Sequence, residues 1–181
     1  YDIPLRLVGS EMCIRDRNRG AQVVALSEAN IREAFEVIGG LEAMSCRLAC
    51  ERATDVEVAE IRALTYEMMA SHARHDLPTY FRTNREIHER ISLASHNSLL
   101  KQLYDAQNAR IQNLRFVSNE NRQKWDLAMR EHIEMADALH ARDADRLAGI
   151  MRQHLQRKCE AALKTLNAGQ APATAQSSGS G

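Results

Sequence analysis

The sequence predicts an all-α fold, an antiparallel bundle of about six helices. Aromatic residues make up only 4% of the chain and Pro occurs three times, while Ala, Leu, Glu, Arg and Met are abundant. Such a composition favours helices. Apolar residues also recur every three to four positions from residue 27 nearly to residue 166. Short breaks with cap and turn residues separate these periodic segments, which favours antiparallel neighbours.

Two helices are expected in the first half of this region. Ser27 is placed to cap a helix over residues 28–53, and Thr54 is placed to begin the next one, which ends before Pro78. The stripe expected to face the core of the first helix is Ile31, Phe35, Ile38, Leu41, Met44 and Leu48. The corresponding stripe of the second helix is Val58, Ile61, Leu64 and Met68.

Four more helices are expected after Pro78. A third covers about 79–95, a fourth opens at Ser98, a fifth covers about 122–141 and the last covers 144–166. The apolar positions of the fourth helix are Leu100, Leu103, Ile111 and Leu114. Residues 167–181 are small and of low complexity, and we expect this tail to be disordered.

Charge, hydropathy and cysteine use exclude several classes of protein. The formal net charge is +0, so the chain as a whole has no basic surface for nucleic acid. No apolar run approaches the roughly 20 residues of a membrane span, and the N-terminal segment suits neither a secretory signal nor a transit peptide. The four cysteines lack metal-binding spacing. We therefore expect a cytoplasmic protein with buried thiols and no membrane partner.

Three histidines stand inside predicted helices, each on or beside an apolar stripe. His88, His132 and His154 come from three different helices, and Asn84 lies one turn before His88 on the same face. Inward-facing histidines from several helices of one bundle can converge on a metal ion. A hydrogen-bonded core histidine is the simpler interpretation for any one of them. The remaining histidines (His72, His75, His96 and His140) fall at helix ends or turns, where solvated or capping roles are expected.

Motifs for other chemistries are missing from the sequence. It contains no HExxH motif, no glycine-rich phosphate loop and no nucleophile elbow, and we assign no catalytic residue. Arg110 and Arg115 could bind an anionic ligand if they point inward, and otherwise are solvated surface residues.

Several blocks of sequence resemble one known family. They read "IREAFEVIGGLEAMSCRLACERATDVEVAEIRAL" (31–64), "YFRTNREIHERISLASHNSLL" (80–100) and "REHIEMADALHARDADRLAGIMRQHLQRK" (130–158). In order and spacing, residues 27–166 resemble the ligand-sensing FCD domain of GntR-type bacterial transcription regulators of the FadR-type branch. The resemblance implies an effector-binding and dimerisation domain without enzymatic activity, acting as a homodimer.

The resemblance also implies a divalent metal site. In this family a carboxamide or carboxylate, a His one turn later and two His from the last two helices bind the metal, and here they match Asn84, His88, His132 and His154. We expect zinc ahead of nickel or manganese. The family often has Asp where this chain has Asn84, so the donors would all be neutral. A small carboxylate effector, bound with help from Arg110 and Arg115, is expected to complete the shell and balance the charge.

The segment "NRGAQVVAL" (18–26) resembles the last strand of the winged helix-turn-helix domain that begins GntR regulators. We expect it to be a remnant of that domain and the rest to lie upstream of the sequence given. The DNA-binding residues would then be missing from this fragment, and DNA would be reached only through the missing domain.

The stretch "LVGSEMCIRDR" (7–17) has another resemblance. It matches, at every position, one reading frame of the transposase adapter used in short-read sequencing libraries. We therefore expect residues 1–17 to be non-native, translated from adapter sequence fused to a truncated gene.

Two rival interpretations remain for the helical region. A metal-dependent helical hydrolase would use the same histidines with an open coordination position. A plain helical dimerisation module would have hydrogen-bonded core histidines and no metal.

Overall fold

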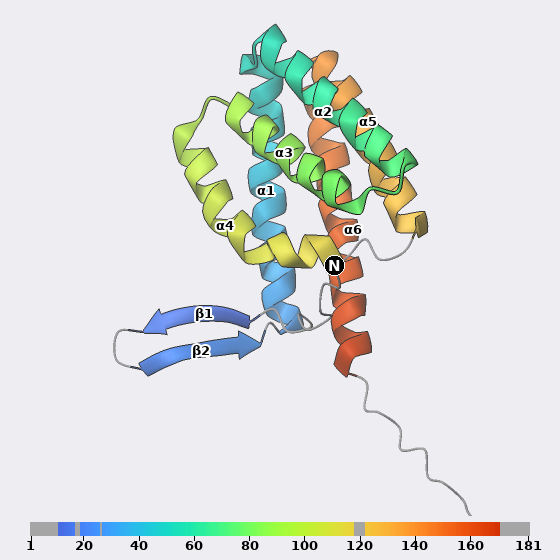
Figure 1. Cartoon of the computed structure of the whole chain (residues 1–181). Helices are drawn as coiled ribbons and strands as arrows, with labels where there is room; N and C mark the ends of the chain where they lie inside the picture. The colour runs from blue at the N-terminus through green and yellow to red at the C-terminus, as the bar shows by residue number, and fades with distance from the viewer. Residues whose placement is uncertain (1–10, 17–18, 26, 118–121, 171–181) are drawn as a thin grey trace, which may run out of the picture.

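The structure is a bundle of helices preceded by a small hairpin (Figure 1). It is a computed structural model that describes residues 11–16, 19–25, 27–117 and 122–170 of the 181-residue chain. The helices in these residues are α1 (Glu28–Arg52), α2 (Asp55–Ala73), α3 (Leu77–Ala94), α4 (Ser98–Val117), α5 (Arg122–His140) and α6 (Ala144–Gln170). The predicted all-α class and the number of helices are confirmed.

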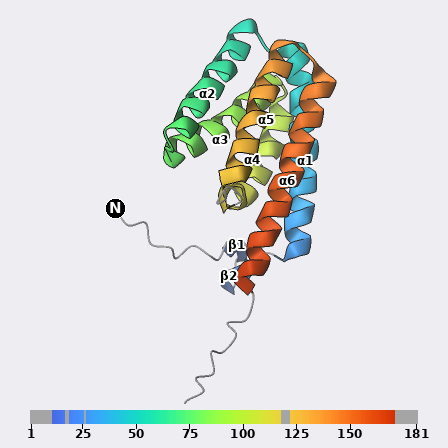
Figure 2. The same cartoon turned by 90° about the vertical axis from the view of Figure 1, so that its right-hand side faces the viewer.

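The longest helices form the centre of the bundle. α1 and α6 lie side by side and run in opposite directions, as both views show (Figures 1 and 2). α3 and α4 pack against α1, while α2 packs on α3 and α5 and is farther from α1. The core therefore fills the space between α1, α3, α5 and α6, where the three in-helix histidines are also found.

Helix starts follow the local signals of the sequence. The Ser27 hydroxyl accepts the Asn30 N–H at 3.2 Å and caps α1. Thr54 and Glu57 form a reciprocal capping box at the start of α2. The Asn97 side chain accepts the Leu100 N–H at 3.1 Å in the first turn of α4.

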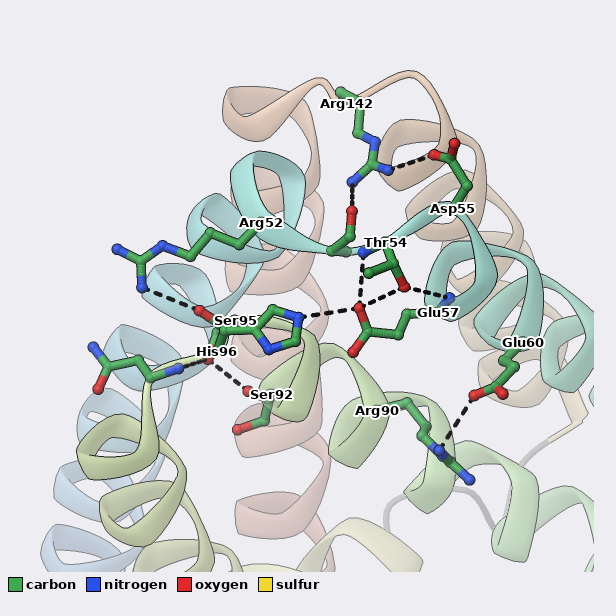
Figure 3. Close-up of polar contacts among 12 residues, drawn as sticks. Arg52, Thr54, Asp55, Glu57, Glu60, Arg90, Ser92, Ser95, His96 and Arg142 are labelled. Atoms are coloured by element: carbon green, nitrogen blue, oxygen red, sulfur yellow. Dashed lines mark hydrogen bonds and ion pairs between the residues drawn. The ribbon is translucent and has the colours of Figure 1, made fainter.

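Polar contacts tie the helix connections together at the end of the bundle away from the hairpin (Figures 1 and 3). The Arg142 guanidinium, between α5 and α6, donates to the Ala53 carbonyl at 2.7 Å and to Asp55 at 2.9 Å. The Arg52 guanidinium donates to the Ser95 carbonyl at 3.2 Å. These bonds join the α1–α2 corner to the α5–α6 and α3–α4 connections.

The core stripe of α1 differs from the predicted one. Met44 was expected to be buried and is 51% exposed. The buried positions after Ile38 instead include Glu42, Ser45 and Ala49, which continue its stripe, and their neighbours Ala43, Cys46 and Cys50. At about 100° per residue, Met44 points roughly 120° away from Ile38, whereas steps of four, three and four residues stay on one face. The prediction at Met44 was wrong because two successive three-residue steps, from Ile38 to Leu41 and Met44, fall short of the 3.6-residue helical period.

In α4 the expected core residue Leu103 is also exposed, by 48%. Its neighbour Tyr104 is buried in its place, in line with Leu100 and Ile111. Tyr104 continues the four-residue step from Leu100, so the aromatic ring takes the core position.

The hairpin pairs β1 (Glu11–Asp16) with β2 (Arg19–Ala25) in antiparallel register, with Met12 opposite Val24. β2 lies within the predicted remnant strand. Strand β1 was not expected, because residues 7–17 show no strand pattern, and it forms through pairing with β2. The hairpin lies beside the start of α1 (Figure 1). Residues 1–10 lie outside the described residues.

The last helix is longer than predicted. α6 continues to Gln170, so residues 167–170 of the expected disordered tail are helical. Ala and Leu in residues 161–166 support helix continuation, and no Pro stands between residues 144 and 171. The rest of that expected tail, 171–181, lies outside the described residues.

Candidate metal centre

Three histidines from three helices converge in the core. His88 of α3, His132 of α5 and His154 of α6 are each at most 2% exposed. One nitrogen of each ring lies within 4.8 Å of one nitrogen of the other two. The Nε2 atoms of His88 and His132 are 3.3 Å apart. The structure thus brings together the three histidines that the sequence singled out.

Each of the three rings is held by a hydrogen bond at Nδ1. The pairs are His88 with Glu42 Oε2 at 2.5 Å, His132 with the Ala128 carbonyl oxygen at 2.7 Å, and His154 with Glu131 Oε2 at 2.5 Å. A carbonyl or carboxylate oxygen can only accept, so each Nδ1 donates. Metal-binding histidines in proteins show this pattern, because the bond at one nitrogen fixes the tautomer and orients the other nitrogen toward the metal.

The proton of one ring can be assigned from these contacts. Burial, with the neighbouring His88, lowers the pKa of His132 to about 3, so its ring is neutral near pH 7. With its proton on Nδ1, His132 directs the lone pair of its Nε2 toward His88 Nε2, 3.3 Å away. A cation bound between the two rings could use that lone pair.

The spacing of the nitrogens suits a first-row divalent metal. A tetrahedral zinc site with Zn–N distances of about 2.0–2.1 Å has ligand nitrogens about 3.3–3.4 Å apart. The 3.3 Å between His88 and His132 matches such an edge. A nitrogen of His154 lies within 4.8 Å of the other two ligand nitrogens. A modest inward movement of its side chain would bring it to the spacing of a tetrahedral site.

Asn84 offers a fourth donor on α3. Its Oδ1 is buried and has no hydrogen-bond partner among the described residues. A buried oxygen without a partner is costly and usually has a water or ion beside it. Asn84 lies one turn before His88, so this unpartnered acceptor is on the same face of α3 as the first histidine.

Four charged side chains surround the histidines. Glu42 and Glu131 are the two carboxylates at Nδ1, Arg157 forms an ion pair with Glu131, and Lys158 is buried one turn after His154. Burial raises the pKa of Glu131, while the Arg157 guanidinium acts in the opposite direction. The formal charges of these four side chains cancel. A divalent ion would therefore give the centre a net charge of two positive units. The carboxylates of Glu42 and Glu131 would each be separated from the ion by one imidazole ring.

Glu42 and Glu131 were not identified from the sequence. Glu42 continues the 3.6-residue period of the buried α1 stripe, and a carboxylate at such a position signals a buried partner. Glu131 directly precedes His132 but pairs with His154 on the next helix, and no local pattern marks that pairing.

The two predicted effector-binding arginines lie on α4. Arg110 is exposed and so is not part of the buried centre. The side chain of Arg115 lies outside the described part of the structure. Their role stays a prediction.

Three cysteines lie in the core. Cys46, Cys50 and Cys159 are buried free thiols. Burial raises the pKa of the Cys46 thiol well above its usual value, and Glu42 one turn before it acts in the same direction. Their burial agrees with the expectation of buried thiols, and their role as packing residues stays a prediction.

The sequence matches a known protein family. The sequence model described as FCD domain matches residues 33–157. The transcriptional repressor RspR of Escherichia coli K12 is 22% identical over 138 residues, which are 76% of this chain and 60% of that protein. The Nta operon transcriptional regulator of Aminobacter aminovorans is 26% identical over 149 residues, 82% of this chain and 69% of that protein. The chain thus spans about three fifths of the length of the first of these relatives.

Solved structures share the fold. E. coli McbR/YncC superposes with a TM-score of 0.74 at 16% identity, covering 84% of this chain and 77% of that one. The metal-free FCD domain of TM0439 has a TM-score of 0.69 at 21% identity and covers 80% of this chain and 99% of that one. None of the described helices has the length and apolar character that crossing a bilayer requires.

Proposed function

We propose that this chain, which belongs to the FCD domain family of GntR-type transcription regulators, senses a small carboxylate-type metabolite at a divalent metal and thereby controls DNA binding. FCD domains belong to regulators and not to enzymes, which argues against the hydrolase interpretation. In the proposal, residues 27–166 bind the effector and form a homodimer, and the whole regulator acts in the cytoplasm.

The observation that carries this proposal is the convergence of His88, His132 and His154 with every Nδ1 already bonded. Histidines that merely fill a core need no shared orientation. Here one nitrogen of each ring lies within 4.8 Å of one nitrogen of the other two, and Asn84 Oδ1 is an unpartnered acceptor on the same face of α3 as His88. This arrangement supports a metal site over the plain dimerisation module.

When bound, the metal would supply a Lewis acid that orients an anionic ligand. His88, His132, His154 and Asn84 would hold it, with zinc expected ahead of nickel or manganese. Glu42 and Glu131 orient two of the rings. The surrounding side chains are neutral in sum, so the positive charge of the loaded centre would favour an anionic effector. Arg110 and Arg115 remain predicted to contribute to effector binding.

Metal analysis of the purified chain tests the site. We expect about one equivalent of zinc per chain after dialysis against zinc, and loss of that zinc in His88→Ala, His132→Ala and His154→Ala. His140→Ala, at the exposed end of α5, is the matched control and should keep its zinc. If the wild-type chain binds no metal and the three variants change neither stability nor response to small carboxylates, the dimerisation module is the better interpretation.

The N-terminal assignments are also part of the proposal. Residues 18–26 would be the remnant of the winged-helix domain, and residues 1–17 would be translated adapter sequence. The incomplete coverage of RspR supports a longer regulator. Re-sequencing the locus tests the second point: a genomic copy that encodes residues 1–17 in frame with Asn18 would contradict it.

Response to an effector requires two states with different affinity for it. A thermal-shift screen of small carboxylates, with and without zinc, should find acids that raise the melting temperature only when zinc is present. The chain given is not expected to bind operator DNA tightly by itself, because its formal net charge is +0.

A further inference from the structure

We propose that Glu42 is a positioning residue that ties the metal centre to α1, so that metal occupancy is transmitted to the helix that follows the N-terminal strand. This inference rests on the proposed metal site. It assigns a role to a side chain that is not itself a metal donor.

The tie is a buried contact between distant parts of the chain. Glu42 stands in the middle of α1, and its Oε2 accepts the His88 Nδ1–H of α3 at 2.5 Å. The two side chains are 2% and 1% exposed. No water competes for such a contact, so it is much stronger than an exposed hydrogen bond between similar groups.

Packing alone does not explain a carboxylate at this position. The other residues of the stripe around it, Ile38, Ser45 and Ala49, are apolar or small. Burying a carboxylate is costly unless it is paired and hydrogen-bonded. An apolar residue would fill the same space at no such cost, so the chemistry of the carboxylate has a function beyond stability.

Metal binding would strengthen this contact. A cation at His88 Nε2 draws electron density from the ring and makes its Nδ1–H a better donor, so the bond to Glu42 tightens. The carboxylate in turn makes His88 a stronger ligand. Metal affinity and the attachment of α1 to α3 are therefore coupled, and each must favour the other.

α1 is well placed to carry that change outward. It begins at Glu28, three residues after β2 ends at Ala25 (Figure 1). Along its length it packs against α6, the helix that carries His154. A change in how firmly α1 is held would reach the strand before it, and with it any domain attached there.

The other carboxylate at the centre provides a matched comparison. Glu131 makes the same kind of bond to His154, also at 2.5 Å, but it joins α5 to α6. Both carboxylates should raise metal affinity, and only Glu42 should connect the metal to α1. Comparing the two glutamates therefore distinguishes an effect on metal affinity from an effect on the coupling between the metal and α1.

The experiment uses the full chain, zinc as the probe and the variants Glu42→Gln and Glu131→Gln, with circular dichroism to verify the fold. A glutamine oxygen can still accept from Nδ1–H but carries no charge. Calorimetry should show zinc affinity lowered by about 10- to 100-fold in each variant. Hydrogen exchange is then measured with and without saturating zinc.

In the wild type, zinc should slow exchange in α1, α3, α5 and α6. In Glu131→Gln the slowing of α1 should be retained. In Glu42→Gln the slowing of α1 should be lost while that of α5 and α6 is kept, a separation that general destabilisation would not produce.

Two results would overturn the inference while the metal site stands: wild-type zinc affinity in Glu42→Gln, or α1 protection by zinc in that variant equal to the wild type. If the wild-type chain takes up no zinc at all, the proposed function fails first and the inference fails with it.

Discussion

At the scale of single residues, the centre depends on the chemistry of its donors and of the groups behind them. Three imidazoles are oriented by two carboxylates and one backbone carbonyl. In the proposed site Asn84 would add an amide oxygen, which has no partner in the described part of the chain. An amide is a weaker ligand than a carboxylate, so we expect the proposed site to have modest metal affinity.

Asn84→Asp should therefore bind zinc more tightly. The aspartate adds one negative charge at the fourth donor position, and we expect an increase in affinity of about tenfold or more, or roughly 1.4 kcal/mol. The same charge should weaken binding of carboxylate effectors. Competition against a chromophoric chelator at fixed pH measures the zinc affinity.

Asn97→Asp is the control for that measurement. Asn97 caps α4, where Asp serves equally well, so zinc affinity should stay at the wild-type value. Unchanged affinity in Asn84→Asp as well would mean that Asn84 does not face the metal.

At the scale of elements, capping and period decide where each helix begins and which face is buried. The Thr54–Glu57 capping box shows this most fully, because Glu57 Oε2 accepts the Thr54 N–H at 2.8 Å and the Thr54 hydroxyl at 2.9 Å (Figure 3). His96 of the α3–α4 turn also contacts Glu57, at 3.1 Å. The start of α2 is thus fixed both locally and from a second helix connection.

The contribution of Glu57 should depend on pH. The Thr54 backbone N–H, first among several contacts, holds the pKa of Glu57 below its usual 4.5. Around and below pH 4.5 the folded state therefore binds fewer protons than the unfolded state, and the stabilisation is lost as the pH falls through the lowered pKa. Urea unfolding should show Glu57→Gln less stable than the wild type by about 0.5–1 kcal/mol at pH 7, with the gap closing in acid.

Glu60→Gln is the matched control on the same helix. Glu60 forms an exposed ion pair with Arg90 at 3.3 Å, and such pairs contribute little. The free energy of unfolding of Glu60→Gln should stay within roughly 0.3 kcal/mol of the wild-type value at every pH. A gap for Glu57→Gln that persists unchanged into acid would contradict the assigned role of the carboxylate.

Gly40→Ala should stabilise α1. Gly40 is exposed inside the helix, and an added Cβ would meet no atom within 4 Å. Replacing a helix-interior glycine reduces the conformational freedom of the unfolded chain, so we expect a gain of about 0.5–1 kcal/mol in the free energy of unfolding. The reverse change at an exposed site of α2, Ala63→Gly, should cost a similar amount. Loss of stability in Gly40→Ala would show that this part of α1 needs the glycine.

At the scale of the whole molecule, the bundle has one hydrophobic core, and the proposed metal centre lies within it. The largest buried side chains come from all six described helices, and the histidines lie among them. The hairpin is separate from this core and lies beside the start of α1 (Figure 1). Stability and metal binding should therefore belong to residues 27–166.

Removing residues 1–17 should leave the folded unit intact. β1 pairs with β2, and its main contacts are with that strand and not with the helices, so the free energy of unfolding should change by less than about 0.5 kcal/mol. Zinc uptake should also be unchanged. Removing residues 1–35 is the contrasting case, because it deletes the buried Ile31 and Phe35. The free energy of unfolding should then fall by several kcal/mol, about the amount expected for the loss of two large core side chains. A comparable loss on removing only residues 1–17 would mean that β1 belongs to the folded unit.

The sequence by itself determined the number and order of the helices and the histidines that face inward. These features depend on caps and on the 3.6-residue period, which are local. The same local information failed at Met44 and Leu103, where one step along the helix changes which side chain is buried. The ends of elements shifted too, as at Gln170, where α6 continues through Gly169, a residue type that often ends a helix.

Only the tertiary structure decided which side chains meet across helices. Glu42 and His88 are 46 residues apart, and Glu131 passes over its neighbour His132 to pair with His154. Such pairings depend on the angle and height at which two helices cross, and neither is visible in the period of one helix. The sequence therefore indicated a possible metal site, and the packing of α1, α3, α5 and α6 supplied the carboxylates that orient it.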